Sequence, residues 1–122
     1  MKMLQSKPVT DRRSKFIATL FHVKSEEDVG NALKTLMKKK KYLKATHNIY
    51  AYRLKTQDNK IIEKKKDDGE TGAGIRILSL LQKNKSINIL IVVTRWYGGI
   101  HLGSDRFKHI VNVTKEVLEL ST

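Results

Sequence analysis

The chain has 122 residues, of which 39% are hydrophobic and none is cysteine, and its 25 lysines and arginines against 12 aspartates and glutamates give a formal net charge of +13 at pH 7. This length suits a single domain over residues 1–122, and the lack of cysteine excludes disulfides, thiolate metal sites and cysteine catalysis. The charge is compatible with nucleic acid, ribosomes, acidic protein surfaces or anionic membranes as partners without choosing among them, and a solvated lysine surface is the alternative. The absence of a membrane-length apolar run or a signal-peptide centre predicts a cytoplasmic protein, and we expect no membrane partner.

The first third of the chain predicts a lead-in, a strand and a helix. Residues 1–13 are interpreted as the lead-in, and residues 16–23 are short, apolar and β-prone. Ser25, followed by three acidic residues, is a typical helix start, and apolar residues then recur at helical spacing as far as Met37. The lysines at 38–41 fall in the last turn, where cations stabilise the terminal carbonyls; a dedicated polyanion site is the alternative.

The middle third predicts a hairpin, a polar loop and a second helix. Residues 45–54 and 61–63 form the two strands of the hairpin, joined by a turn rich in Asn and Asp. Residues 64–74 are polar and contain three glycines. Apolar positions at helical spacing then predict a helix that ends near Asn84, a residue type that tolerates the left-handed conformation.

The last third predicts the centre of the fold. Residues 87–94 are a nearly continuous β-branched and leucine run, which is typical of a strand covered on both faces, and we interpret them as the central strand. The strand runs into a glycine-rich loop, where α/β proteins usually place ligands. Ser104 or Asp105 offers an N-cap, and an amphipathic stripe predicts a helix over residues 105–120.

The predicted order is therefore strand, helix, strand, strand, helix, strand, helix. Helices that interrupt a few strands without strict alternation favour an α/β fold in the form of a two-layer sandwich. We expect a mixed four-stranded sheet with its helices on one face.

The glycines after the central strand do not form a nucleotide-binding motif. Gly98, Gly99 and Gly103 match neither the dinucleotide fingerprint nor a P-loop, because the spacing is wrong and no Gly-Lys-Ser/Thr follows. Gly98 and Gly99 are expected to permit a positive φ or a close backbone approach, as part of either a tight structural turn or a ligand loop.

Asp67, Asp68 and Glu70 place three carboxylates just before the second helix. They could bind a divalent cation, although no distant partner carboxylate is evident. Capping and the helix dipole explain them at least as well. A third alternative is an ion pair with Arg76 or Arg95 that would hold the loop.

The remaining polar residues give no enzymatic signature. The four histidines show neither metal-ligand spacing nor a Ser-His-Asp arrangement, so we expect no catalytic residue, no metal and no cofactor. Aromatic residues lie beside Arg53 and Arg95, an arrangement that allows base stacking on single-stranded nucleic acid; core packing is the alternative.

Six segments in a fixed order resemble a known family. They are TDRRS at 10–14, ATHNIYAYR at 45–53, DDGET at 67–71, RWYGGI at 95–100, LG at 102–103 and DRFKH at 105–109. Together they resemble the IMPACT family, the ancient domain shared by eukaryotic IMPACT proteins and bacterial YigZ-type proteins, and are most similar to the eukaryotic branch. The resemblance covers the chain from Thr10 to about Leu120.

The resemblance implies a fold like the second domain of ribosomal protein S5 and of ribonuclease PH, which can contain a left-handed crossover. It implies a non-enzymatic regulator of translation under amino-acid starvation, which dampens the general-control kinase by competing for its ribosome-associated activator and is linked to actin. For the bacterial branch it implies a cleft that binds nucleic acid, so an RNA- or ribosome-binding module is the alternative function. We expect neither the N-terminal RWD domain of eukaryotic members nor the ferredoxin-like second half of bacterial members.

These arguments converge on one predicted binding cleft. It combines polar residues of the hairpin, the acidic loop, the second helix, the glycine-rich loop and the start of the last helix. The predicted cleft residues are His47, Arg53, Asp67, Asp68, Glu70, Thr71, Arg76, Arg95, Tyr97, Gly98, Gly99, Gly103 and Arg106.

Overall fold

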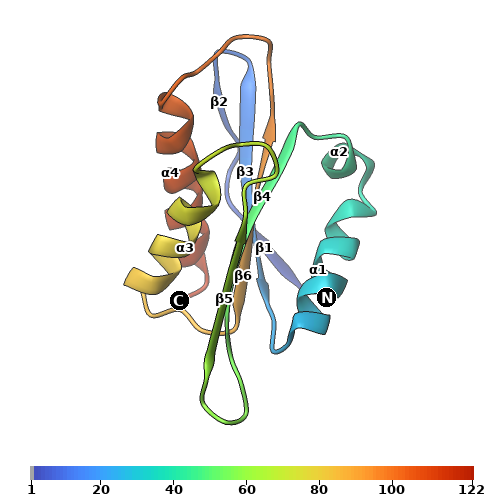
Figure 1. Cartoon of the computed structure of the whole chain (residues 1–122). Helices are drawn as coiled ribbons and strands as arrows, with labels where there is room; N and C mark the ends of the chain where they lie inside the picture. Colours follow the sequence, from blue (N-terminus) through green and yellow to red (C-terminus); the bar gives the residue numbers. More distant parts are fainter. Residues whose placement is uncertain (1) are drawn as a thin grey trace.

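A computed structural model describes residues 2–122, in which helices pack on a twisted antiparallel sheet (Figure 1). The sheet has six strands in the order β1-β3-β6-β4-β5, and β2 also pairs with β3. The strands are β1 Met3–Gln5, β2 Val9–Asp11, β3 Ser14–His22, β4 His47–Lys55, β5 Ile61–Lys66 and β6 Ile89–Trp96. The helices are α1 Glu26–Met37, α2 Lys40–Leu43, α3 Ala73–Lys83 and α4 Asp105–Leu120.

The prediction of a central strand is confirmed. β6 lies between β3 and β4, and every residue from Ile89 to Arg95 is buried. It begins two residues later than expected, because Asn88 adopts a positive φ of 59° and turns the chain into the strand. The hairpin of β4 and β5 and the last helix also lie where the sequence places them.

The α/β class is confirmed, but the sheet differs from the prediction in two respects. It has six strands rather than four, and all its pairings are antiparallel rather than mixed. The two additional strands, β1 and β2, lie in the segment interpreted as a lead-in. Each has only three residues, too few for a recognisable alternation. Between them, Ser6 keeps the edge joined to β3, since its amide donates to the Ala18 carbonyl and its Oγ accepts from the Ala18 amide, both at 2.9 Å.

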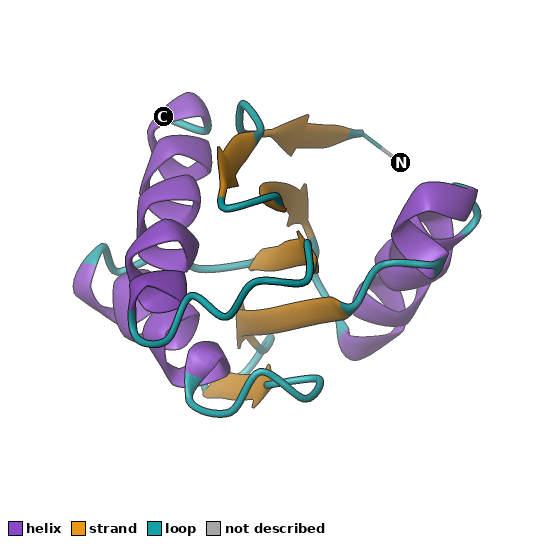
Figure 2. Ribbon diagram, turned by 90° about the horizontal axis from the view of Figure 1, so that it is seen from above, coloured by secondary structure: helices purple, strands orange, loops and turns teal. Residues whose placement is uncertain are grey.

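The helices lie on both faces of the sheet, not on one as predicted (Figure 2). α3 and α4 pack on one face in a core that includes Ile77 and Ile110, whereas α1 and α2 pack on the other in a core that includes Leu36 and Tyr42. Because β6 buries the side chains of both its faces, it needs a helical layer on each. The apolar stripe of α1 satisfies that need but does not reveal which face it covers.

The first helix begins as predicted and ends differently. Ser25 Oγ accepts a hydrogen bond from the Asp28 amide at 3.1 Å, which caps α1. The lysine run does not fill the last turn. Lys38 is the C-cap of α1, Lys39 is extended, and the run continues into the short helix α2.

Two further observations concern the helices. α3 ends at Lys83 as predicted, but the left-handed residue after it is Lys85, with a φ of 53°, rather than Asn84. Within residues 2–122, no helix is both long enough and apolar enough to cross a membrane.

Candidate functional site

A cavity of about 400 Å³ lies at the end of the sheet where β6 runs into the glycine-rich loop, at the top of Figure 1. We call it the loop-end cleft. Six of its residues belong to the predicted set. Two others, His101 and Leu102, lie in the predicted glycine-rich loop, and Thr46, directly before β4, was not predicted. Its lining residues are Thr46, His47, Glu70, Arg95, Tyr97, His101, Leu102, Gly103 and Arg106.

Glu70 is the centre of the loop-end cleft. Its side chain is 7% exposed. Its carboxylate forms ion pairs with Arg95 Nη1 at 2.6 Å and with Arg106 Nε at 2.9 Å. His47 Nε2 lies 3.8 Å from the same carboxylate. The predicted ion pair across the cleft is therefore confirmed for Arg95. Because a buried carboxylate is costly unless paired, these contacts fix the acidic loop against β6 and α4.

Arg95 is held from several sides. Its guanidinium carbon lies 5.6 Å from the ring centre of Tyr97 and 5.3 Å from that of Phe16, and its Nη2 donates to Ser14 Oγ at 3.3 Å. Its Nε is the buried side-chain polar atom within residues 2–122 that has no hydrogen-bond partner. Arg95 therefore works as an anchor inside the fold, with its charge balanced by Glu70.

The two aspartates of the acidic loop have structural roles. Asp67 accepts hydrogen bonds from the amides of Gly72, at 3.0 Å, and Gly74, at 2.7 Å, which cap α3 and lower the pKa of the Asp67 carboxyl. Asp68 accepts from the Asn48 amide at 2.7 Å, and its carbonyl lies 2.8 Å from His47 Nδ1. The capping interpretation is confirmed for Asp67. Within residues 2–122, no three His, Cys, Asp or Glu side chains are grouped to hold a metal ion.

The loop after β6 is anchored at its start. A Cβ added to Gly98 would lie 2.2 Å from the carbonyl carbon and oxygen of Arg13, so only glycine fits. The amide of Gly98 donates to Ser14 Oγ at 3.2 Å, and that of Tyr97 donates to Thr46 Oγ1 at 2.9 Å. Gly99 and Gly103 adopt positive φ, so both predicted uses of glycine occur in this loop.

Seven of the thirteen predicted residues do not line the loop-end cleft. Asp67, Asp68, Gly98 and Gly99 hold the neighbouring loops, as described above, whereas Arg53, Arg76 and Thr71 have other surroundings. Arg53 pairs with Glu63 at 2.7 Å and donates to the Ser86 carbonyl. It lies six residues after His47 in β4, which separates the two residues by roughly 20 Å along the strand. Arg76 stacks on Phe107 instead, with its guanidinium carbon 3.9 Å from the ring centre.

Thr71 is exposed on the loop before α3 and makes no side-chain hydrogen bond to residues 2–122. The cleft is therefore smaller than predicted, with Glu70 as its only acidic lining residue.

A polar cluster beside the cleft was not recognised from the sequence. Asp11 Oδ2 lies 2.7 Å from His109 Nε2 and 3.1 Å from Arg12 Nη2, and Arg12 also reaches Asp105 at 2.6 Å. Hydrogen bonds from Arg12 and then His109 lower the pKa of Asp11 to about 2. The cluster ties β2 to α4. Asp105 and His109 are four residues apart and therefore lie on one face of the helix. That spacing in the sequence could have indicated the cluster.

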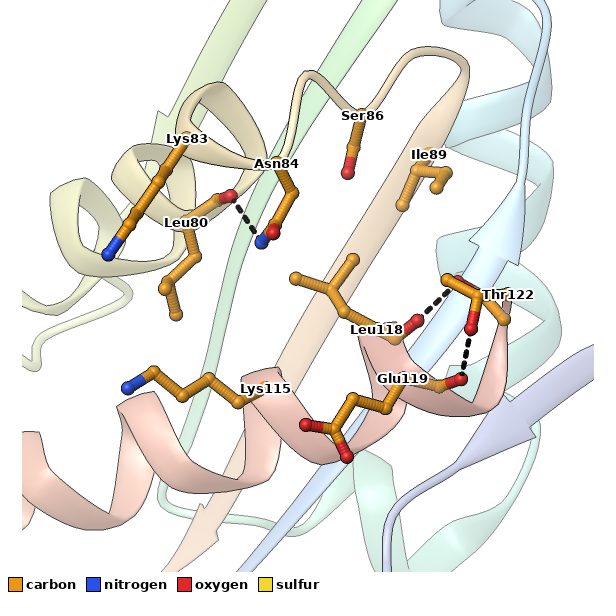
Figure 3. Close-up of a pocket in the computed structure, with 10 residues that line it drawn as sticks. Leu80, Lys83, Asn84, Ser86, Ile89, Lys115, Leu118, Glu119 and Thr122 are labelled. Atoms are coloured by element: carbon orange, nitrogen blue, oxygen red, sulfur yellow. Dashed lines mark hydrogen bonds between the residues drawn. The ribbon is translucent and has the colours of Figure 1, made fainter.

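A second cavity, of about 520 Å³, lies at the opposite end of the sheet and contains none of the predicted residues (Figure 3). It is formed by the ends of α3 and α4 and the start of β6. Its lining residues are Leu80, Lys83, Asn84, Ser86, Ile89, Lys115, Leu118, Glu119, Ser121 and Thr122.

Comparison with known sequences gives a consistent result. The family described as the Impact N-terminal domain matches residues 12–118. Protein IMPACT homolog of Dictyostelium discoideum is 51% identical over 112 residues, which are 92% of this chain and 32% of that protein. Protein IMPACT homolog of Caenorhabditis elegans is 46% identical over 121 residues, 97% of this chain and 47% of that protein. The chain thus spans 32% and 47% of the length of these two relatives.

Comparison with solved structures agrees. The two-domain translational regulator Yih1 is 40% identical, with a TM-score of 0.68 over 98% of this chain and 46% of that one. A crystal structure of a hypothetical protein, 24% identical, superposes with a TM-score of 0.81 over 98% of this chain and 61% of that one, which supports the fold alone.

Proposed function

The chain belongs to the IMPACT family, and from that premise we propose that it is a non-enzymatic protein-interaction domain of a translation regulator. The proposal extends to the pathway that the family resemblance implies. The chain would act in the cytoplasm and dampen the general-control kinase by competing for the kinase's ribosome-associated activator. The description of Yih1 as a translational regulator supports the first part of this proposal.

The observation that carries the proposal is the pairing of charge in the loop-end cleft. Arg95 and Arg106 both contact Glu70, so one carboxylate offsets part of their charge and holds both guanidinium groups within the fold. Above them, the anchored loop presents Tyr97, 39% exposed, and Ile100, 46% exposed. An aromatic and an aliphatic side chain on a rigid loop are suited to a protein partner, because aromatic anchors are enriched where protein interfaces concentrate their binding energy.

A binding measurement with the activator tests the proposal. Purified kinase-binding segment of the activator is immobilised, and the affinity of this chain is compared with that of Tyr97→Ala/Ile100→Ala. We expect the double variant to bind at least about tenfold more weakly, because each truncation removes an exposed contact. Circular dichroism of the variant checks that the loss of the Tyr97 ring beside Arg95 leaves the fold intact. Adding the kinase's own activator-binding domain should displace the wild-type chain.

The matched control removes two exposed apolar side chains elsewhere. Ile61 and Leu120 are 42% and 54% exposed and lie at the start of β5 and the end of α4, at the opposite end of the sheet from the loop. Ile61→Ala/Leu120→Ala should bind like the wild type. Equal binding by all three proteins, or no displacement by the kinase domain, would contradict the proposal.

A second candidate, an RNA- or ribosome-binding module, is favoured by one arrangement. Lys15 Nζ lies 5.2 Å and Lys41 Nζ 5.8 Å from the Trp96 ring centre, and Trp96 Nε1 donates to the Lys41 carbonyl at 2.9 Å. Lys41, the last lysine of the run at 38–41, therefore lies beside an aromatic residue near the loop end. Lysines around an aromatic ring are typical of single-stranded nucleic-acid sites.

Fluorescence anisotropy with labelled single-stranded RNA, at about 50 and 200 mM salt, separates the two candidates. Binding that persists at the higher salt and is lost in Trp96→Leu would favour the RNA module. Binding that disappears with salt, whatever residue occupies position 96, would leave the protein-interaction proposal as the better one.

A further inference from the structure

A groove runs between α3 and α4 on the outer surface of the molecule. The 520 Å³ cavity of Figure 3 adjoins a second cavity of about 470 Å³, and the two share Leu80, Lys83 and Lys115. The second cavity also includes residues of the first two turns of α3 and the middle of α4. We call the two together the α3–α4 groove. Its additional lining residues are Ile75, Arg76, Ser79 and Val111.

The floor of the groove is apolar. Leu80, Ile89 and Leu118 line it with side chains that are 7–9% exposed, so they are covered by the fold but reachable from the groove. Ile75 lies further along and is 45% exposed. An exposed isoleucine at one end of an apolar floor extends the surface that a partner could bury.

The rim of the groove is basic. Arg76 and Lys83 project from α3 and Lys115 from α4, and all three residues are exposed. Figure 3 shows the side chains of Lys83 and Lys115 reaching out on the same side of the cavity from facing helices. Neither lysine forms an ion pair with any residue in 2–122. Glu119, near the C-terminal end of α4, is the acidic residue of the lining.

We propose that the α3–α4 groove binds an acidic amphipathic helix of a partner protein. A groove between two helices accepts a third helix, whose apolar stripe lies on the leucine floor. Carboxylates that flank this stripe would pair with the unpaired cations on both rims, and this complementarity favours an acidic occupant over a neutral or basic one. The chain's charge of +13 attracts such a segment from a distance.

The length of the groove sets the length of the ligand. α3 has 11 residues, which corresponds to roughly 16 Å of helix. Three to four helical turns therefore cover the groove, with apolar residues at spacings of three and four and acids beside them. The groove shares no lining residue with the loop-end cleft, so the proposal can fail without affecting the proposed function.

A designed peptide tests the proposal. The probe is a fluorescein-labelled 16-residue helix with leucines along one face and glutamates flanking them, and its anisotropy is followed as the whole chain is added. We expect saturable binding in the range of tens of micromolar, typical of short helix-in-groove contacts. Amide chemical-shift changes in the ¹⁵N-labelled protein should concentrate on α3 and α4.

Two charge-reversal variants separate the groove from general electrostatic attraction. Lys83→Glu/Lys115→Glu reverses the rim, whereas Lys38→Glu/Lys39→Glu makes the same change in net charge at the end of α1, on the other face of the sheet. We expect the rim variant to weaken binding by about tenfold or more and the control by less than about twofold. Ile75→Ser, which leaves the charge unchanged, should also weaken binding.

Three results would overturn the proposal. The first is the absence of binding at peptide concentrations of about 1 mM, and the second is equal binding of a peptide with the same composition but dispersed leucines. The third is an equal loss of affinity in both charge-reversal variants, which would mean that only net charge matters.

Discussion

The two ends of the sheet use charged residues in opposite ways. At the loop end, Glu70, Arg95 and Arg106 are paired with one another, and the first two are buried. At the other end, Lys83 and Lys115 are exposed, and no residue in 2–122 pairs with them. The paired charges join three segments of the chain and therefore contribute to the fold. The unpaired charges contribute little to the fold and remain free to meet a partner.

The largest expected effect comes from unpairing the loop end. Glu70→Ala leaves the buried charge of Arg95 without its partner, which we expect to lower the free energy of unfolding by about 3–5 kcal/mol. Urea denaturation measures this change. Glu119→Ala is the matched control at the other end, and we expect a change within about 0.5 kcal/mol. A similar decrease in the free energy of unfolding for the two variants would contradict the claim that charges stabilise the fold only at the loop end.

The next effect concerns the backbone of the loop end. Gly98→Ala places a Cβ 2.2 Å from the Arg13 backbone, so the loop or the β2–β3 turn must move. We expect a loss of stability of about 3 kcal/mol. In contrast, a Cβ at Gly30 in the interior of α1 meets nothing within 4 Å, so Gly30→Ala should stabilise by about 0.5–1 kcal/mol. Thermal unfolding measures both variants. A lower unfolding temperature for Gly98→Ala and a higher one for Gly30→Ala would show that the loop is rigid.

A smaller effect depends on pH. Arg12 and His109 hold the pKa of Asp11 at about 2, below the ordinary aspartate value. A carboxyl with a lowered pKa in the folded state stabilises the fold above its unfolded pKa, and this contribution is lost as the pH falls. Stability should therefore decrease between about pH 4 and the pKa of about 2.

The Asp11→Asn variant tests this acid dependence. Its stability should depend less on pH over that interval than the wild type's, as followed by circular dichroism during acid titration. Parallel titration curves would show that Asp11 does not contribute.

The smallest expected effect is at the groove. Lys83→Glu/Lys115→Glu changes two exposed side chains without ion-pair partners in residues 2–122, so the free energy of unfolding should stay within about 0.5 kcal/mol of the wild type. Urea denaturation gives the value. A destabilisation of more than about 1 kcal/mol would mean that these lysines already have a role in the fold.

Much of the fold could be predicted from local patterns. The strand around Ile91 has a continuous apolar run, and α4 has a clear amphipathic stripe. The direction of strands is not encoded in such periodicity, so the antiparallel sheet could not be distinguished from a mixed one. The β2–β3 hairpin was also hidden, because its turn places Arg12 and Arg13 at positive φ instead of the usual Asn-Gly.

The candidate site was predictable only in part. The ion pair between Glu70 and Arg95 followed from opposite charges on two segments expected to meet near the end of β6. Arg53 does not line the cleft with the others, because its strand is long enough for its two ends to belong to different surfaces. Ser14 was missed, since a serine that accepts hydrogen bonds from a buried arginine and a loop amide leaves no pattern in the sequence.

The central position of β6 determines the order in which the sheet can assemble. Its register pairs Trp96 with Lys15 and Arg95 with His47, so both of its neighbours come from much earlier in the chain. Such long-range pairing is slow compared with local contacts. During synthesis, β3 and β4 emerge first and keep an unpaired inner edge until residues 89–96 have left the ribosome. A growing chain that stalls before that point exposes two apolar strand edges to aggregation.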